Sequence, residues 1–527
     1  MFKWLFGKKA SREIIINAEP LETRVVLVEK GKVEEFQVEH TTDERIVGSI
    51  YKGRIQNLEH DLQAAFVDIG LRKNAFLHYW DMFLDISSMD EDEILSRIDR
   101  RSLPRQRRIT PQEVERLFPP GSEIVVQVVK GMIGTKGPRV TAVLSIPGRY
   151  LVLMPGSLLR GISKKIEDEA ERKRLRKILD TIHISKDCGI IVRTAATNAR
   201  KRDIIEEAHR LQQKWDELKR KIAETPAPAC IYQEPDVIER VIRDWLTGDV
   251  DRIVVDSKEV YERLKQITST MGARGKVKIQ LYDGDLPIFE HYKIEQQLEN
   301  VFSNKIMLES GGYIVIEETE ALTTVDVNSG RYKGEGSQED AILQINLEAA
   351  EEIARQLRLR NIGGLLVIDF IDMRSRKSQN TVYRAFKEAL KRDRAKTNVL
   401  PISSLGLMEM TRQRSDESIE SSSHMPCPYC RGRSTVKSPL QISVELQRRL
   451  TTILRKSKKS DEKKALQAVV HPAVLERLKR EDEQYLLDIE AKYNAQLTFK
   501  SDPNRHIECF SILDPATGEI LYSNEEK

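Results

Sequence analysis

The chain has 527 residues, with 86 Lys or Arg against 82 Asp or Glu, so its net charge is only +4. This length predicts about three or four domains, and any basic surface must be local because the overall charge is nearly balanced. No stretch reaches the roughly 18 apolar residues of a membrane helix, which excludes an integral membrane protein. Five cysteines exclude a disulfide scaffold and indicate a reducing, cytoplasmic setting.

The N-terminal part is predicted to be rich in short strands. The first three are expected at residues 13–17, 24–28 and 33–38. A second cluster is expected at residues 48–55, 64–70, 75–78 and 123–130. Its glycine turns and the aromatic residues at the strand ends are typical of a small barrel. A polar insert at 81–121, first acidic and then basic, interrupts this barrel, and the sequence assigns it no role.

The middle of the chain is predicted to be more helical. Residues 163–225 are highly charged and helical except for an apolar strand at 189–193, and Pro226–Pro228 marks a linker. Helices and strands alternate through 237–280. The tail, 436–527, is predicted to be helical and then to end in short strands at 495–500 and 509–513.

Between residues 310 and 400 lies a strand–helix–strand pattern. A strand at 313–317 leads into an antiparallel strand at 323–328, and a long helix begins at Ser337, where Asp340 completes a capping box. The apolar run 365–370 is typical of a strand buried on both faces. A strand, a crossover helix and a second strand form a right-handed parallel unit, so the strands 323–328 and 365–370 are expected to be parallel.

Two carboxylates stand at the ends of these strands. Asp326 and Asp369 each lie near the carboxyl end of a strand, which is where α/β sheets place their functional crevice. If the strands are neighbours, the pair can hold one hard cation such as Mg²⁺, and Asn328 points to the same side. The alternative is that each Asp only caps the following helix. The occurrence of both on one unit favours the metal.

A cysteine pair lies near the start of the tail. Cys427 and Cys430 have the spacing of half a zinc knuckle, whereas tetrahedral zinc requires four ligands. A second chain that supplies its own pair would complete the site and predicts a homodimer that shares Zn²⁺. His424 as a third ligand and a redox-active pair are the alternatives, but the thioredoxin-like context that the second requires is missing.

Several of these motifs carry a resemblance to a known family. They are TTVDVN at 323–328, DFIDM at 369–373, the Cys427–Cys430 pair, IYKGR at 50–54, AAFVD at 64–68, LVLMP at 151–155, VRT at 192–194, and the stretches 346–360 and 408–414. Together they make the chain resemble the bacterial endoribonucleases of the ribonuclease E/G family. In length it is closer to the ribonuclease G branch than to the longer ribonuclease E branch.

The resemblance implies an α/β multidomain fold. A ribonuclease-H-like domain, split over 11–44 and 238–301, would hold an OB-fold RNA-binding barrel at 45–142 and a 5′-end sensor at 143–237. A deoxyribonuclease-I-like catalytic domain would follow at 302–423. A zinc link at 424–437 and a small α+β dimerisation domain at 438–527 would complete the chain, and the family's assembly would be a homodimer or homotetramer.

The resemblance also implies roles for individual residues. Asp326 and Asp369 match the Mg²⁺ ligands of the family, Asn328 matches its companion asparagine, and Cys427 and Cys430 match its intersubunit zinc ligands. The activity would be Mg²⁺-dependent cleavage of single-stranded RNA. Because the metal can activate the attacking water, no histidine pair is needed, and the products would carry a 5′-phosphate and a 3′-hydroxyl.

Five further positions match RNA contacts of the family. Phe66 and Phe76 match positions that stack on bases, although packing in the core would be the ordinary explanation of either phenylalanine alone. Lys136 matches a phosphate contact. Arg193 and Thr194 match the pocket for a 5′-monophosphate, whose recognition suits the guanidinium fork. Lys396 stands where the family often has a supporting arginine.

Some questions stay open at this level. A non-catalytic RNA-binding scaffold on the same fold is the second hypothesis, and the intact Asp326, Asn328 and Asp369 favour the enzyme. The partners would be ribosomal RNA precursors or messenger RNA, for maturation or decay. Residues 1–10 lack the cleavage site of a signal peptide. Their aromatic and basic side chains could touch an anionic membrane surface, but a frayed end is favoured.

Overall fold

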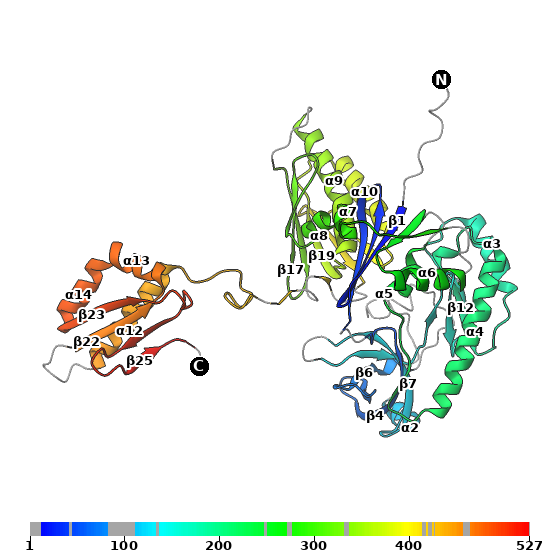
Figure 1. The fold of residues 1–527 in the computed structure, drawn as a ribbon, viewed down its shortest axis with the longest axis horizontal. Coiled ribbons are helices and arrows are strands. Elements are labelled where there is room, and N and C mark those ends of the chain that lie inside the picture. Colours follow the sequence, from blue (N-terminus) through cyan, green and yellow to red (C-terminus); the bar gives the residue numbers. More distant parts are fainter. Residues whose placement is uncertain are drawn as a thin grey trace. The chain divides into compact units, whose positions relative to one another are not determined.

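The computed structural model describes residues 12–41, 45–82, 111–132, 136–246, 250–270, 277–330, 337–413, 418–419, 424–425, 427–456 and 464–525. The chain divides into two compact units, Met1–Ser422 and Ser423–Lys527, which Figure 1 colours from blue to orange and from orange to red. The N-terminal segment 1–10 and residues 83–110 of the polar insert lie outside the described residues. In the described ranges, no helix has both the length and the apolar character needed to cross a membrane.

The first unit begins with a five-stranded sheet in the order β15-β14-β1-β2-β3. Its strands are β1 (Arg12–Ala18), β2 (Glu22–Glu29), β3 (Lys32–His40), β14 (Arg252–Val255) and β15 (Lys278–Leu281). Helices α5 (Val237–Trp245) and α6 (Lys258–Thr270) pack on one face. Helices α7 (Ile288–His291) and α8 (Glu295–Val301) pack on the other. Residues 12–40 and 252–281 therefore form one sheet that is covered on both sides.

The second part of the first unit is a closed barrel. It consists of β4 (Ile50–Glu59), β5 (Ala64–Asp68), β6 (Ala75–His78), β8 (Arg139–Thr141) and β7 (Glu123–Lys130), and β7 returns to β4. The short helices η1 (Tyr79–Asp81) and α2 (Pro111–Leu117) belong to it. The predicted barrel is confirmed. The sequence did not predict β13 (Ala229–Tyr232), which forms because β5 leaves the edge of β4 free at residues 50–52.

A third layer packs a small sheet against two helices. The sheet order is β11-β12-β10-β9, from β9 (Ile146–Pro147), β10 (Leu151–Pro155), β11 (Arg160–Ile162) and β12 (Cys188–Val192). The helices are α3 (Glu169–Asp180) and α4 (Lys201–Glu224), and η3 (Thr194–Ala196) follows β12. The strand expected at 189–193 corresponds to β12, which is buried along its whole length.

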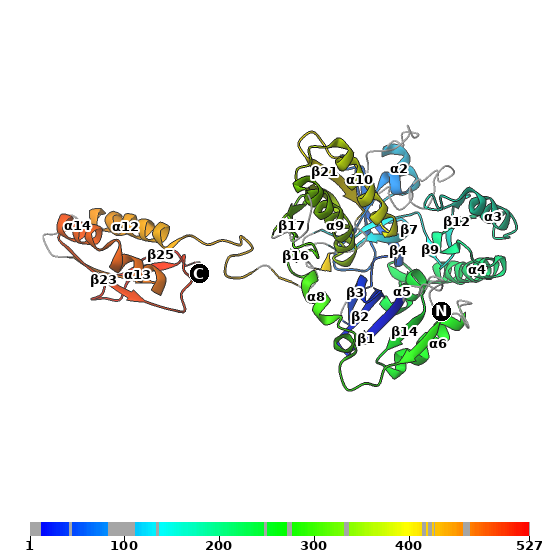
Figure 2. The same cartoon turned by 90° about the horizontal axis from the view of Figure 1, so that it is seen from above.

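The fourth layer contains the candidate site. Its six-stranded sheet has the order β16-β17-β18-β19-β21-β20. The strands are β16 (Lys305–Met307), β17 (Tyr313–Glu318), β18 (Thr323–Asn328), β19 (Gly364–Asp369), β20 (Thr397–Val399) and β21 (Leu407–Arg412). Helices α9 (Gln338–Leu359) and α10 (Arg376–Ala389), with η4 (Leu390–Arg392), form a core with one face of this sheet. Figures 1 and 2 show both helices along that face.

The long helix α9 begins where the capping box predicts. The Ser337 hydroxyl accepts a hydrogen bond from the Asp340 backbone N–H at 3.2 Å, which caps the first turn. Asn361 has a φ of +52° and ends the helix. The parallel pairing of β18 with β19, and the antiparallel pairing of β17 with β18, agree with the predicted unit.

The second unit is a small α+β domain. Its sheet order is β23-β22-β24-β25, from β22 (Lys464–Val470), β23 (Ala495–Ser501), β24 (Phe510–Leu513) and β25 (Ile520–Ser523). Its helices are α12 (Pro439–Lys456), α13 (Pro472–Arg480) and α14 (Glu483–Tyr493). The prediction of a helical segment before residue 495 missed β22. Its Lys, Ala, Leu and Gln residues favour helix, but partners on both edges hold it as a central strand.

Candidate active site

The candidate site is a pair of carboxylates on the open face of the six-stranded sheet. Asp326 on β18 and Asp369 on β19 are direct partners in the parallel pairing of the two strands. Strand neighbours lie about 4.8 Å apart, and partners point to the same side of a sheet. Their neighbours Val325 and Ile368 are buried under the helices, whereas both aspartates are exposed. The alternation of buried and exposed residues therefore presents the two carboxylates together.

The amide of Asn328 belongs to the same cluster. Its Nδ2 donates a hydrogen bond to Oδ2 of Asp326 at 2.8 Å, which orients that carboxylate. Burial raises the pKa of Asp369, and the nearby charges of Asp326 and Asp372 raise it further. Carboxylates that repel each other in this way gain stability from a shared cation.

The donor set fits a hydrated hard cation. Among the residues that the structure describes, no three or more His, Cys, Asp or Glu side chains gather in a geometry for a metal ion. The donors present are two carboxylates, one of which is hydrogen-bonded by the Asn328 amide. Mg²⁺ commonly uses one or two protein carboxylates and keeps water and substrate phosphate as its other ligands. The donors at Asp326 and Asp369 match that requirement.

A buried asparagine on the helix-covered side of the sheet supports this site and was not identified from the sequence. Asn346 on α9 is completely buried. Its Nδ2 donates to the carbonyl oxygen of Ile371 at 2.8 Å, and its Oδ1 accepts from the Ile371 N–H at 3.1 Å. Ile371 lies two residues after Asp369, so the amide fixes the turn that leaves the carboxylate strand. A polar residue on the apolar face of α9, three positions after Leu343, was the signal in the sequence.

The barrel presents aromatic side chains on its outside. Phe66 and Phe76 are cross-strand partners, with ring centroids 6.0 Å apart in an edge-to-face arrangement. Both are half-buried and lie outside the barrel core, which Ala65, Val67, Ala75 and Leu77 help to form. Packing in that core therefore does not explain the two phenylalanines. Lys136 lies three residues before β8, the strand that pairs in parallel with β6, and its side chain is exposed.

Trp80 extends this surface, and the buried ring of His78 lies between it and Phe76. Neither residue was identified from the sequence. His78 lies 6.5 Å from Phe76 and 6.0 Å from Trp80 between ring centroids. The Trp80 side chain is 46% exposed. Trp80 belongs to η1 and not to β6, so the two-residue period of the strand did not point to it.

Arg193 is held by backbone and side-chain partners at the end of β12. Its Nη1 donates to the Gly148 carbonyl at 2.6 Å and to Oδ1 of Asp244 at 2.8 Å. Although burial works against ionisation, Arg243 and Arg193 hold the pKa of Asp244 well below its usual range. Asp244 lies 51 positions away in the sequence, and no local pattern pointed to it. Thr194 is exposed at the start of η3.

A buried carboxylate organises the backbone beside Arg193. Glu207 on α4 accepts hydrogen bonds from the backbone N–H groups of Arg149 at 2.7 Å, Tyr150 at 2.6 Å and Leu151 at 3.0 Å. Burial raises the pKa of Glu207, against the effect of these three donors. The contact holds the start of β10 next to the carbonyl that receives Arg193.

The cysteine pair lies in a tight turn of the second unit. Cys427 is exposed, and the backbone N–H groups of Cys430 and Tyr429 lower its pKa. The nearby His506 is already engaged, because its Nε2 lies 2.6 Å from the Tyr429 carbonyl oxygen and its Nδ1 accepts from the Glu508 N–H. His424 is exposed. In the described part of this unit, Cys427 and Cys430 therefore form a cluster of two thiols.

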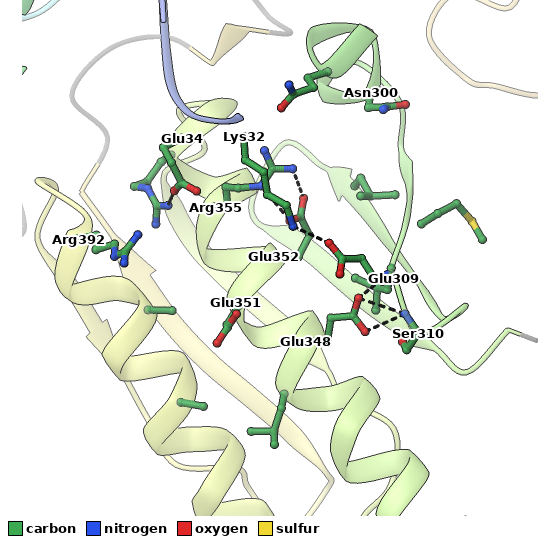
Figure 3. A pocket seen from close by; sticks show the side chains of 18 of the residues that line it. Lys32, Glu34, Asn300, Glu309, Ser310, Glu348, Glu351, Glu352, Arg355 and Arg392 are labelled. Carbon is green, nitrogen blue, oxygen red and sulfur yellow. Dashed lines mark hydrogen bonds and ion pairs between the residues drawn. The ribbon is translucent and has the colours of Figure 1, made fainter. Parts of the chain in front are cut away.

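A large cavity of about 1500 Å³ lies elsewhere, along α9 and α10 and beside the start of β3 and the segment 305–310, which includes β16. Figure 3 shows hydrogen bonds and ion pairs among some of its side chains, including one from the Ser310 N–H to Glu348. Lys32 Nζ contacts Oε1 of Glu309 at 2.6 Å, and Arg355 contacts Glu352 at 2.6 Å. The pair Asp326 and Asp369 does not line it. Arg355 on α9 also donates a hydrogen bond to the Val33 carbonyl on β3. The polar side chains around this cavity therefore connect α9 to the first sheet.

A barrel with exposed aromatic residues, joined to a half-covered α/β sheet, defines a multidomain α/β protein of the kind that binds oligonucleotides. The sequence profile of the ribonuclease E/G family matches residues 145–415. Ribonuclease G of Escherichia coli (strain K12) is 37% identical over 501 residues, which cover 95% of this chain and 99% of that protein. Ribonuclease G of Haemophilus influenzae is 36% identical over 504 residues with the same coverage.

The longer relatives match over only part of their length. Ribonuclease E of Haemophilus influenzae is 35% identical over 510 residues, which cover 96% of this chain and 52% of that protein. The chain belongs to the ribonuclease E/G family. It is thus an endoribonuclease, a hydrolase that acts on RNA.

Proposed function

We propose that the chain is a Mg²⁺-dependent endoribonuclease that cuts single-stranded RNA at Asp326 and Asp369, in RNA processing and decay. The observation that carries the proposal is the direct pairing of the two aspartates on neighbouring parallel strands. When bound, Mg²⁺ would stabilise the charge that develops on the phosphate and would lower the pKa of a bound water. Hydrolysis would break the bond between phosphorus and the 3′ oxygen, add the hydroxyl of a water molecule to phosphorus and its proton to the leaving oxygen, and so leave a 5′-phosphate and a 3′-hydroxyl.

The residues of the chain have distinct tasks in this proposal. Asp326 and Asp369 hold the cation near the carboxyl ends of the two central strands, on an exposed sheet face where an extended strand of RNA has access. Asn328 orients the Asp326 carboxylate through its 2.8 Å hydrogen bond. Asn346 fixes the turn after Asp369 from inside the core. Because the bound Mg²⁺ would lower the pKa of the attacking water, the site needs no side chain as a general base.

The RNA-binding part of the proposal uses the barrel. Phe66 and Phe76 would stack on unpaired bases, a contact worth about 1–3 kcal/mol per base. Lys136 would meet a backbone phosphate. The half-buried position of the two rings outside the barrel core supports this role.

The preference for a 5′-monophosphate is assigned to Arg193 and Thr194. A guanidinium has five N–H donors in a rigid fork. Asp244 and the Gly148 carbonyl orient this fork through Nη1. Thr194 begins η3 immediately beyond it. A monophosphate fits such a small polar site, whereas a triphosphate brings additional bulk and charge.

The proposed organisation follows the family. The ribonuclease-H-like domain would comprise 11–44 and 238–301, the OB-fold barrel 45–142, the sensor 143–237 and the catalytic domain 302–423. The zinc link, 424–437, would join two chains through Cys427 and Cys430, and 438–527 would add dimer contacts. Two thiols per chain, with both ring nitrogens of His506 bonded to Tyr429 and Glu508, support a Zn²⁺ shared between protomers in a homodimer or homotetramer. The protein would act in the cytoplasm.

The test compares variants on the same sheet face. Asp326→Asn and Asp369→Asn should abolish cleavage of a 5′-monophosphorylated single-stranded RNA while they leave its binding intact, as measured by fluorescence anisotropy in EDTA. Glu409→Gln is the matched control, because Glu409 is an exposed carboxylate on the neighbouring strand β21 and should keep full activity. Wild-type rates for either aspartate variant in Mg²⁺ would refute the assignment, and equal cleavage of the corresponding DNA would refute the RNA specificity.

A further inference from the structure

The open face of the six-stranded sheet carries a basic side chain close to the carboxylate pair. Lys305 on β16 is the partner of Val315, and Val315 is the partner of Asp326. These three side chains therefore form one row across three strands. In the next row, Met307 is the partner of Tyr313, which is the partner of Asn328.

Lys305 is exposed, and an aromatic ring orients it. Its Nζ lies 3.7 Å from the centroid of the Tyr313 ring. Among the residues that the structure describes, no carboxylate forms an ion pair with Lys305. Lys32, in contrast, is paired with Glu309 at 2.6 Å. A ring attracts an ammonium group without neutralising it, so Lys305 keeps its charge for another partner.

The charge of its surroundings indicates what that partner is. Asp326, Asp369, Glu317 and Glu409 are exposed on the same face and make it acidic. An RNA backbone is repelled by such a surface except where a cation meets it. Lys305 supplies a cation next to the proposed Mg²⁺ site. The backbones of the first and third strands in a row are about 10 Å apart, and the Lys305 ammonium lies over Tyr313 on the strand between them, so Lys305 stands beside the carboxylate pair and does not contact it.

The second row adds apolar surface for a nucleotide. Tyr313 is half-buried, and the Met307 side chain is 64% exposed. An aromatic edge and a thioether beside a phosphate-binding lysine suit the sugar and base of one nucleotide.

We propose that Lys305, oriented by Tyr313, binds a backbone phosphate of the substrate RNA next to the scissile phosphate. The bound strand then runs across β18, β17 and β16 on the open face. This inference rests on the proposed function of Asp326 and Asp369, because it takes their position as the point of cleavage. Lys305 contributes to substrate binding and not to the chemical step.

The experiment measures the salt dependence of binding and the kinetic constants separately. The full chain binds a fluorescent 5′-monophosphorylated single-stranded RNA in EDTA over a series of KCl concentrations, and kcat and KM are measured in Mg²⁺. Each phosphate contact on a single strand contributes about 0.7 to the slope of log affinity against log salt. Lys305→Gln should lower that slope by about 0.7 and raise KM roughly threefold to tenfold, with kcat within about twofold of wild type.

Three further variants sharpen the test. Lys305→Arg should restore the slope, and Tyr313→Phe should keep it because the ring remains. Tyr313→Leu should raise KM through the loss of that ring. Lys32→Gln is the control, since its charge is already paired, and its slope should equal that of the wild type.

The outcomes separate the two ideas. An unchanged slope for Lys305→Gln, or a loss in kcat with an unchanged slope, would overturn the phosphate contact. Cleavage by Asp326→Asn would overturn the proposed active site whatever Lys305 does. A reduced slope for Lys305→Gln together with inactive Asp326→Asn supports both.

Discussion

Replacement of Asn346 by Ala tests whether the core of the domain positions the candidate active site. Asn346 is completely buried, and the substitution removes its two part-buried hydrogen bonds to the backbone of Ile371. The net loss is about 1 kcal/mol per hydrogen bond, and it rises to about 3 kcal/mol where the remaining partner is shielded from water. For two hydrogen bonds we therefore expect Asn346→Ala to lower the free energy of unfolding by about 2–6 kcal/mol.

The same change should affect catalysis through position. Ile371 lies two residues after Asp369. Without the two hydrogen bonds from Asn346, the turn between Asp369 and Ile371 is held less firmly. Displacement of a reacting group by about 1 Å can reduce a rate about 100-fold. We expect kcat to fall by about 10- to 100-fold, and the Mg²⁺ concentration for half-maximal activity to rise, because Asp369 is less well placed.

A second buried amide on the same helix is the control. Gln356 is 1% exposed, donates to Glu352 at 2.7 Å and accepts from Arg360 at 2.9 Å. Gln356→Ala should lower stability without a change in the Mg²⁺ requirement. The assays are urea denaturation and cleavage at a series of Mg²⁺ concentrations, at temperatures where both variants are folded. Equal losses of kcat in the two variants would show that Asn346 acts only through global stability, and an unchanged kcat in Asn346→Ala would refute its positioning role.

The remaining predictions concern the sensor and the thiols. Arg193→Ala should remove the preference for 5′-monophosphate over 5′-triphosphate and 5′-hydroxyl ends, and equal losses in the cleavage of all three RNAs would show that Arg193 is structural. Cys427→Ser with Cys430→Ser should release half a zinc per chain and shift the mass measured by light scattering toward the monomer; a full zinc in a stable monomer would refute the shared site. Burial raises the pKa of Cys188 to about 11, so at pH 8 roughly one such thiol in a thousand is ionised. In metal-free protein, alkylation followed by mass spectrometry should therefore label Cys427 long before Cys188, and faster labelling of Cys188 would contradict that order.

The carboxylate pair was predictable because its signals are local. The apolar runs around Asp326 and Asp369 mark two strands, and the capping box at Ser337 marks the start of the helix between them. A crossover helix of this kind makes the strands parallel. The sequence did not predict that the two aspartates are direct register partners, because register depends on packing under the whole sheet.

The features that the sequence did not reveal depend on distant partners. Asp244 meets Arg193 from 51 positions away, and Asn346 meets Ile371 from 25 positions away. Neither contact leaves a periodic pattern in the sequence. A polar residue on the apolar face of a helix, such as Asn346, indicates only that a buried hydrogen-bond partner exists. Strand β22 was missed for the same reason, because its neighbours β23 and β24 overcome a composition that favours helix.

The two main sheets of the first unit differ in how many of their faces are covered by helices. Helices pack on both faces of the first sheet, whereas α9 and α10 cover one face of the six-stranded sheet. The other face keeps Leu365 45% exposed and Met307 64% exposed, although burial of such side chains is worth about 1.5–3 kcal/mol each. The same face holds Asp326, Asp369 and Lys305, so a covering layer would gain apolar contacts and would block access to all three. An open face that forgoes this stabilisation is what an enzyme needs if an extended polymer must lie across its active site.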